Sequence, residues 1–142
     1  MGFWDYGRDD IRQWLAINLQ MTKKDYTTEK NVENVIFEQL KSLDKNKNVH
    51  NQYSVGGFLS LKIDFDLYDG KVGIELKLAK ELLKSSTNVE RLLGQILYYS
   101  KRKYGSSIIV LIVGTKEEYN AIIKEIEDIV YSLRLTFVYK IV

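Results

Sequence analysis

Residues 62–80 read KIDFDLYDGKVGIELKLAK, two runs of alternating apolar and polar side chains on either side of the dipeptide Asp69-Gly70. Alternation with a period of two is typical of β-strands, and Asp-Gly between two such runs is a strong signal for a two-residue hairpin turn. We therefore predict two antiparallel strands, over residues 58–68 and 71–79, and expect this hairpin to organise the rest of the fold.

The turn sets the pairing of the two strands. Counting outward from it places Asp64 directly opposite Glu75, and directly opposed residues lie about 4.5–5.5 Å apart on one face of a sheet. Alternation gives each face four side chains: Asp64, Asp66, Glu75 and Lys77 on one, and Phe65, Leu67, Ile74 and Leu76 on the other, which we expect to face the core. Opposed carboxylates repel unless a cation lies between them or solvent covers the face.

Hydrophobic periodicity predicts the remaining elements. The expected helices are residues 8–21, 27–43, 87–105 and 115–133, and the further strands are residues 49–55, 107–114 and 136–142. The order α, α, β, β, β, α, β, α, β predicts an α/β protein, in which an antiparallel meander continues through crossovers into a mixed sheet with helices on both faces. The strand at 107–114 is apolar throughout, which is typical of burial on both faces. Charges near the middle of such a sheet are costly unless they are paired or coordinated.

Polar residues and glycine mark the ends of the expected helices. Thr27 or Thr28 is the expected N-cap of the second helix, and Thr87 or Asn88 is that of the third. Gly105 is expected to end the third helix. Residues 44–48 are expected to form a polar loop.

Composition narrows the possible chemistry. The chain has 142 residues, enough for one domain, and its net charge of +2 neither indicates nor excludes a nucleic-acid partner. It has no cysteine, which excludes disulfides and thiolate zinc sites, and one histidine, which argues against a histidine metal cage. No apolar run approaches the roughly 20 residues that span a bilayer, so we expect a cytoplasmic protein without a membrane segment. Hydrolytic chemistry would depend on carboxylates, lysines and a hard cation.

The charged face of the hairpin predicts a metal site. Asp64 and Glu75 could hold Mg²⁺ or Mn²⁺, hard ions that proteins bind through one or two carboxylates, with the backbone carbonyl of Leu76 as a further ligand. Lys77 could then orient or activate an attacking water, or stabilise the charge that develops on a phosphate. The alternative is a solvated hairpin face whose charges only keep the sheet soluble.

Asp64 and the tripeptide Glu75-Leu76-Lys77, which follow the helix at 27–43, resemble the PD-(D/E)XK nuclease superfamily. Its members share an α-β-β-β-α-β core, with an aspartate on the second core strand and E-x-K on the third. Gln95 and Tyr99 add a Q-x-x-x-Y spacing that resembles the RecB-like and Holliday-resolvase-like branch. The family's proline is replaced by Ile63.

The resemblance implies a restriction-endonuclease-like core over residues 27–114. Residues 1–22 would be an accessory helix, and residues 115–142 a C-terminal helix and strand, all within one domain. The implied activity is Mg²⁺- or Mn²⁺-dependent hydrolysis of phosphodiester bonds, most simply in DNA. The alternatives are an inactive module of this fold that binds nucleic acid or assembles with protein, and an interaction domain that uses the N-terminal helix. A homodimer is compatible with either.

The resemblance also assigns roles to residues outside the hairpin. Gln95 would act in the site and Tyr99 would contact nucleic acid, although Tyr98 is the expected core residue of the pair. Glu33, or alternatively Glu29, would supply a further acid from the helix at 27–43. Independently of the resemblance, the positive charge of four side chains could supply phosphate contacts: Arg91, Lys101, Arg102 and Lys103. The last three also suit the negative end of the helix dipole. Asp66 competes with Asp64 for the metal role.

Overall fold

The computed structural model describes residues 7–43, 48–57 and 59–142. Its elements are α1 (Arg8–Ile17), α2 (Glu29–Lys41), β1 (Val49–Ser54), β2 (Lys62–Leu67), β3 (Val72–Leu78), α3 (Ala79–Leu82), α4 (Ser86–Tyr99), the π-helical turn η2 (Ser100–Tyr104), β4 (Ile108–Gly114), α5 (Lys116–Ser132) and β5 (Thr136–Ile141). The predicted order of helices and strands is confirmed. Only the short α3 and the π-helical turn were not expected.

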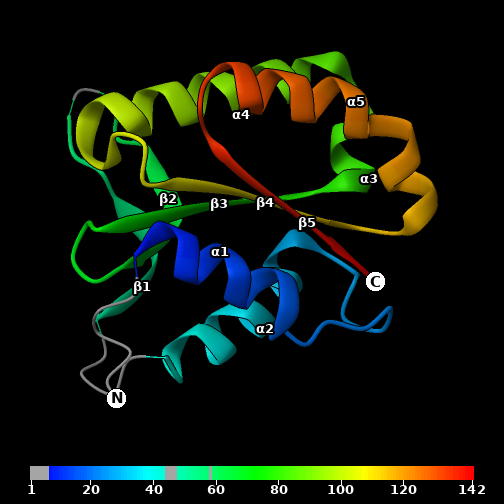
Figure 1. Ribbon diagram of the computed structural model, residues 1–142, viewed down its shortest axis with the longest axis horizontal. Coiled ribbons are helices and arrows are strands. Elements are labelled where there is room, and N and C mark those ends of the chain that lie inside the picture. The colour runs from blue at the N-terminus through cyan, green and yellow to red at the C-terminus, as the bar shows by residue number, and fades with distance from the viewer. Residues whose placement is uncertain (1–6, 44–47, 58) are drawn as a thin grey trace.

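The five strands form one mixed sheet in the order β1-β2-β3-β4-β5. Strands β1, β2 and β3 are an antiparallel meander, and β3, β4 and β5 run parallel. Crossovers between parallel strands are almost always right-handed. The connections from β3 to β4 and from β4 to β5 cross the sheet in the same direction, so their helices lie on the same face. Figure 1 shows this arrangement, with α4 and α5 on one side of the sheet and α1 and α2 on the other. The predicted α/β class is thus confirmed.

Two hydrophobic layers fill the space between the sheet and its helices. The layer beneath α1 and α2 contains the four side chains that alternation assigned to the core: Phe65, Leu67, Ile74 and Leu76. The layer beneath α4 and α5 contains side chains of both helices and alternate residues of β4. All seven residues of β4 are buried, as its apolar sequence predicted. In the described part of the chain, no helix combines the length and apolar character needed to cross a bilayer.

The hairpin has the predicted register. Three pairs define it: Phe65 with Ile74, Asp66 with Gly73, and Leu67 with Val72. At the bend, Asp69 and Gly70 have the positive φ values, 54° and 91°, that a mirror-type hairpin turn requires, but Tyr68 also has a positive φ of 58°, so β2 ends one residue before the predicted turn. A side chain at Gly70 would in addition meet the side chain of Lys103, because an added Cβ would lie 2.6 Å from Lys103 Cε. The Lys103 side chain could move aside, so the positive φ is the main reason for glycine at this position.

Several predicted boundaries were wrong. The strand expected at 58–68 begins only at Lys62, because Ser60 has a positive φ of 54° that an extended strand does not tolerate. The helix expected at 8–21 ends at Ile17. The N-cap of α4 is Ser85, whose hydroxyl accepts from Thr87 N at 3.1 Å, and not Thr87 or Asn88.

Two other expectations about the helix ends were met. Thr28 caps α2, and Gly105 follows η2 with a φ of 58°. Residues 1–6 of the expected N-terminal accessory segment and residues 44–47 of the expected polar loop lie outside the described residues.

Candidate functional site

The two strands of the hairpin separate immediately beyond the pair Phe65–Ile74, where Asp64 and Glu75 would be the next to face each other. At this point carboxylate side chains replace backbone carbonyls as hydrogen-bond acceptors. The N–H of Leu76 donates to Asp64 Oδ2 at 2.7 Å, and the N–H of Asp64 donates to Glu75 Oε1 at 3.4 Å. Two backbone donors that strand separation would leave unpaired are thus satisfied by carboxylates. The two predicted acids lie together, as the register required.

Burial decides the electrostatics of this pair. Asp64 is 8% exposed and Glu75 is 2% exposed. Burial raises the pKa of Glu75 well above its usual range, the charge of Asp64 raises it further, and Lys77 opposes both. Burial also raises the pKa of Asp64, against the lowering effect of the hydrogen bond from Leu76 N–H. Both carboxyl groups are therefore harder to ionise than free carboxyl groups, and nearby positive charge opposes this effect.

Lys77 supplies part of that charge. Its Nζ lies 4.0 Å from Glu75 Oε2 and 3.8 Å from Glu29 Oε1 on α2, and its side chain is 21% exposed. The lysine thus connects β3 to the start of α2 and still reaches solvent. Glu29 is itself affected by the site, because burial raises its pKa while Lys77 lowers it.

Glu33 is buried, at 4% exposure, whereas most carboxylates on a helix surface are solvated. Gln52 Nε2 donates to Glu33 Oε1 at 2.7 Å and to Asp64 Oδ1 at 3.0 Å, and Asn51 Nδ2 donates to Glu33 Oε2 at 3.3 Å. A single amide therefore bridges the acid of α2 and the acid of β2. Sequence reasoning missed Gln52, because a glutamine in a weakly predicted strand has no local feature that distinguishes it.

Leu76 places its side chain in the core at 0% exposure, so only its backbone could serve a site. In a β-strand the N–H and C=O of one residue point to the same edge. Because the N–H of Leu76 points to Asp64, its carbonyl points into the same gap between β2 and β3. This orientation is the one that the predicted role as a backbone ligand needs.

Tyr99 is the buried member of the tyrosine pair, contrary to the expectation for Tyr98. It continues the stripe of Leu92 and Ile96 at helical spacing and is 0% exposed. Its hydroxyl donates to Lys62 O at 2.8 Å, at the start of β2. A fully buried ring has no face available for a nucleotide, which argues against the predicted direct contact with nucleic acid. Tyr99 instead anchors β2 beside the site.

Gln95, one turn before Tyr99, is partly buried. Its Oε1 is shielded from solvent, and no described residue donates a hydrogen bond to it.

One turn before Gln95 on the same helix, Arg91 lines a small pocket of about 140 Å³ together with Lys77 and Glu29. Arg91 is therefore the one predicted phosphate contact that shares a cavity with the site lysine.

The other predicted phosphate contacts lie elsewhere. Lys101, Arg102 and Lys103 are exposed on η2, and Lys103 Nζ donates to the hydroxyl of Tyr53 on β1 at 3.2 Å. A helix rises about 1.5 Å per residue, so Arg102 lies roughly 16 Å along the axis from Arg91. Arg91 therefore lies apart from the three cations of η2, although all four are on one continuous helical run.

Asp66 does not join Asp64. It is 0% exposed and accepts from Tyr104 Oη at 2.5 Å and from Gly70 N at 3.3 Å. One ligand atom each of Asp66, His50 and Asp69 lies within 4.8 Å of the others, and His50 Nε2 is 3.6 Å from Asp69 Oδ1.

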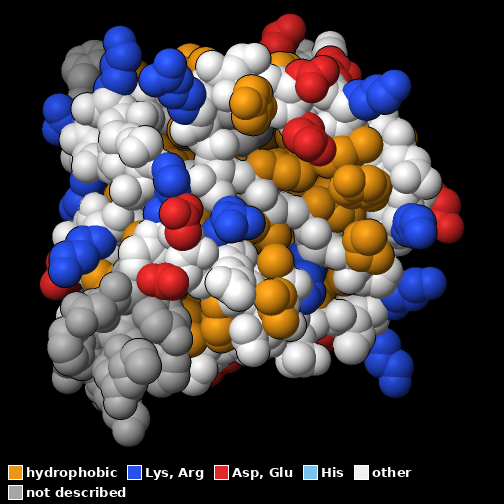
Figure 2. Space-filling view, in the orientation of Figure 1, with side chains coloured by type: hydrophobic (Ala, Val, Ile, Leu, Met, Phe, Trp, Pro, Cys, Tyr) orange, Lys and Arg blue, Asp and Glu red, His pale blue; other side chains and the backbone are white. Residues whose placement is uncertain are grey.

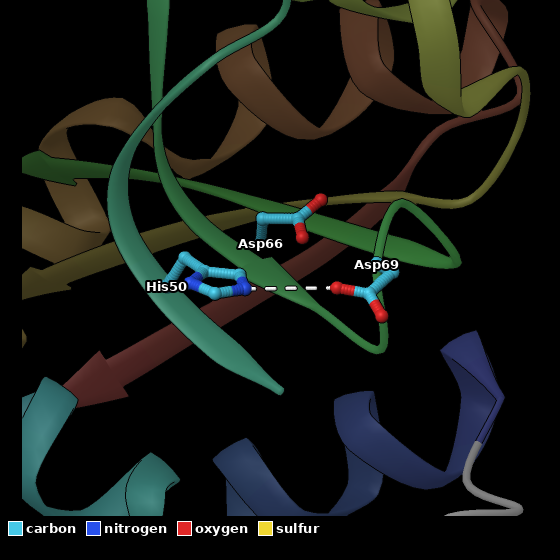
Figure 3. Close-up of side chains that lie close together, drawn as sticks. All are labelled: His50, Asp66 and Asp69. Atoms are coloured by element: carbon cyan, nitrogen blue, oxygen red, sulfur yellow. Dashed lines mark ion pairs between the residues drawn. The ribbon is translucent and has the colours of Figure 1, made fainter. Parts of the chain in front are cut away.

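Figure 3 shows the side chain of His50, on β1, facing that of Asp69 at the bend between β2 and β3. Among the described residues this is the group of three histidine or acidic residues compact enough to hold a metal ion. Asp64 and Glu75 are not in it. A metal at the predicted position would rest on two carboxylates and a carbonyl.

Comparisons with known proteins do not assign the chain to a family. No family model matches it, and searches of curated proteins and of solved structures find no match. The functional argument therefore rests on the chemistry of the residues around Asp64 and Glu75.

Proposed function

We propose that this protein is a metal-dependent nuclease of the PD-(D/E)XK type, which hydrolyses phosphodiester bonds in DNA. The observation that carries the proposal is the junction of Asp64, Glu75 and the Leu76 backbone where β2 and β3 separate, with Lys77 beside it. The order of elements from α2 to β4 supports a restriction-endonuclease-like αβββαβ core.

The donor set fits a hard divalent cation. Asp64 and Glu75 offer carboxylate oxygens, the Leu76 carbonyl points into the same gap, and nearby positive charge favours ionisation of both acids. Oxygen ligands of this kind suit Mg²⁺ or Mn²⁺. When bound, such an ion supplies charge neutralisation at the phosphate and lowers the pKa of a coordinated water.

The chain's own residues have separable roles in this proposal. Lys77, partly exposed between Glu75 and Glu29, orients the attacking water and stabilises negative charge on the phosphate. Gln52 fixes the orientation of Asp64 through its second bond to Glu33. Arg91 holds a phosphate in the pocket that it shares with Lys77.

One observation favours a second candidate. The network is largely satisfied internally, since Leu76 N–H and Gln52 bind Asp64, and Lys77 lies close to two glutamates. Buried polar networks of this kind also hold strands in place without chemistry. The second candidate is an inactive module of the same fold that binds nucleic acid or assembles with protein.

The deciding experiment is incubation of the protein with supercoiled, linear and branched DNA in Mg²⁺, Mn²⁺ or EDTA. We expect cleavage with either ion and none in EDTA, and at least a hundredfold loss in Asp64→Asn, Glu75→Gln and Lys77→Met, on the scale that removal of a key electrostatic group costs. Glu117→Gln, an exposed acid of α5, is the matched control. Unchanged cleavage by Glu75→Gln would refute the nuclease assignment, and DNA binding without cleavage by any form would favour the inactive module.

A further inference from the structure

The two edges of the sheet differ in how well they are protected. The edge strand β1 contains Gln52 with a φ of 50°, a break in the extended backbone. The opposite edge strand, β5, has no glycine or proline and a single charged residue, Lys140. In the described residues no strand pairs with the outer edge of β5. Native proteins usually interrupt or charge such an edge, because its free N–H and C=O groups pair readily with another strand.

An apolar groove runs beside this edge. It has a volume of about 370 Å³ and lies between α5 and β5, with Ile123 and Tyr131 on the helix and Phe137 and Tyr139 on the strand. Tyr131 is 83% exposed. Figure 2 shows hydrophobic side chains gathered on this face of the molecule, where Figure 1 places α5 and β5. An exposed apolar groove along an open strand edge is typical of an interaction surface.

The sequence of β5 is nearly palindromic about Val138. It reads Thr136-Phe137-Val138-Tyr139-Lys140, that is, polar, aromatic, valine, aromatic, polar. We propose that β5 pairs antiparallel with β5 of a second copy, centred on Val138, to form a homodimer with one continuous ten-stranded sheet. This inference is independent of the proposed nuclease function.

The proposed register matches the faces of the strand. Phe137 of each copy lies opposite Tyr139 of the other, and both side chains belong to the layer beneath α5. The second copy thus adds an aromatic pair on each side of the symmetry axis, next to the groove. On the other face, Lys140 lies opposite Thr136 and not opposite another lysine. In a two-fold antiparallel pairing Lys140 would face Lys140 of the other copy only in a register centred on that residue, so like-charge repulsion disfavours that register.

The available area also suits a second copy. A buried Phe or Tyr contributes about 150–250 Å². Covering the groove residues and the strand edge would therefore bury several hundred Å² on each copy, the order of the roughly 800 Å² per partner of a stable interface. A two-fold pairing satisfies both open edges at once and closes the assembly. An extended peptide of another protein would leave its own second edge open.

The test is analytical ultracentrifugation of the full chain over a range of concentrations, with two substitutions at one position. Thr136→Lys places a lysine opposite Lys140 in both symmetric pairs, and Thr136→Glu places an acid there. We expect the first to raise the dimer dissociation constant and the second to lower it, each by roughly twofold to thirtyfold. Circular dichroism checks that both variants fold.

The register has its own readout, because the chain contains no cysteine. Thr136→Cys and Lys140→Cys proteins are mixed and oxidised, and we expect the disulfide between the two different variants to predominate. A chain that stays monomeric up to about 100 μM, a concentration at which micromolar dimers are complete, overturns the proposal and leaves the edge to an extended segment of another protein. A dimer that both Thr136 variants leave unchanged, or that shift in the same direction, also overturns it.

Discussion

The N–H of Leu76 donates a 2.7 Å hydrogen bond to Asp64 Oδ2 across the gap where β2 and β3 stop pairing. A carboxylate thus occupies the place of the next backbone acceptor. The consequence is a buried acid pair, Asp64 and Glu75, at a point where the sheet opens. The proposed chemistry depends on this opening, because a continued ladder would leave no room for an ion or a phosphate.

Glu75→Gln should remove a pH dependence of stability in EDTA. The pKa of Glu75 is raised above 4.5 in the folded protein, so the folded state retains the proton more strongly than the unfolded state. The free energy of unfolding therefore falls as pH rises above about 4.5, until Glu75 is ionised in the fold. Urea titrations between pH 4 and 8 should show a shallower decline for Glu75→Gln. An equally steep decline in this variant would mean that another group causes the slope.

Mn²⁺ should stabilise the protein through Asp64. At one hundred times the dissociation constant, a ligand adds about 2.7 kcal/mol, which corresponds to a rise of roughly 5–10 °C in Tm for a domain of this size. Asp64→Asn should abolish the rise in a thermal melt. His50→Gln is the control for the other compact group, His50, Asp66 and Asp69. Loss of the rise in His50→Gln, with retention in Asp64→Asn, would place the ion at the hairpin turn.

Gln52→Met should destabilise the fold and lower cleavage together. The substitution keeps the side-chain length but removes the donor that serves Glu33 and Asp64, so we expect a loss of about 1–3 kcal/mol. Asn51→Ala removes only the 3.3 Å bond to Glu33 and should cost less. Chemical denaturation measures both. Equal stability of the two variants would show that Gln52 does not bridge the acids in solution.

Tyr99→Phe should affect stability and not DNA affinity. It deletes the hydroxyl that donates to Lys62 O in the core, at a cost of about 0.5–1.5 kcal/mol. Tyr98→Phe is the matched control, because its hydroxyl donates to Gly56 O at the surface and should contribute less. Denaturation and fluorescence anisotropy with labelled DNA separate the two effects. Weaker DNA binding by a fully stable Tyr99→Phe protein would contradict its role as an anchor.

Arg91→Gln and Arg102→Gln should differ in their effect on cleavage. Each removes one cation that can contact phosphate, so each should reduce the slope of log affinity against log salt by about 1. Only Arg91 lies in the pocket with Lys77, so only Arg91→Gln should also lower the single-turnover rate at saturating DNA. An equal rate loss in both variants would argue for one continuous phosphate track.

The register of the hairpin and the order of helices and strands along the chain follow from the amino-acid sequence by itself. Asp69-Gly70 selects a tight turn, and a period of two then assigns Phe65 and Ile74 to one face and brings Asp64 to Glu75. These features depend on neighbours in the chain, so local pattern is sufficient to predict them. The apolar run of β4 identified a strand buried on both faces for the same reason.

Tertiary structure alone decided which polar groups meet. Gln52 contacts Glu33 and Asp64 from 19 and 12 positions away along the chain, and Tyr99 rather than Tyr98 is the buried tyrosine, bonded to the start of β2. The unprotected edge of β5 likewise exists only because the strand is last in the sheet. Periodicity reports the side on which a residue lies, but long-range hydrogen bonds and exposed edges depend on how separate elements are placed in space.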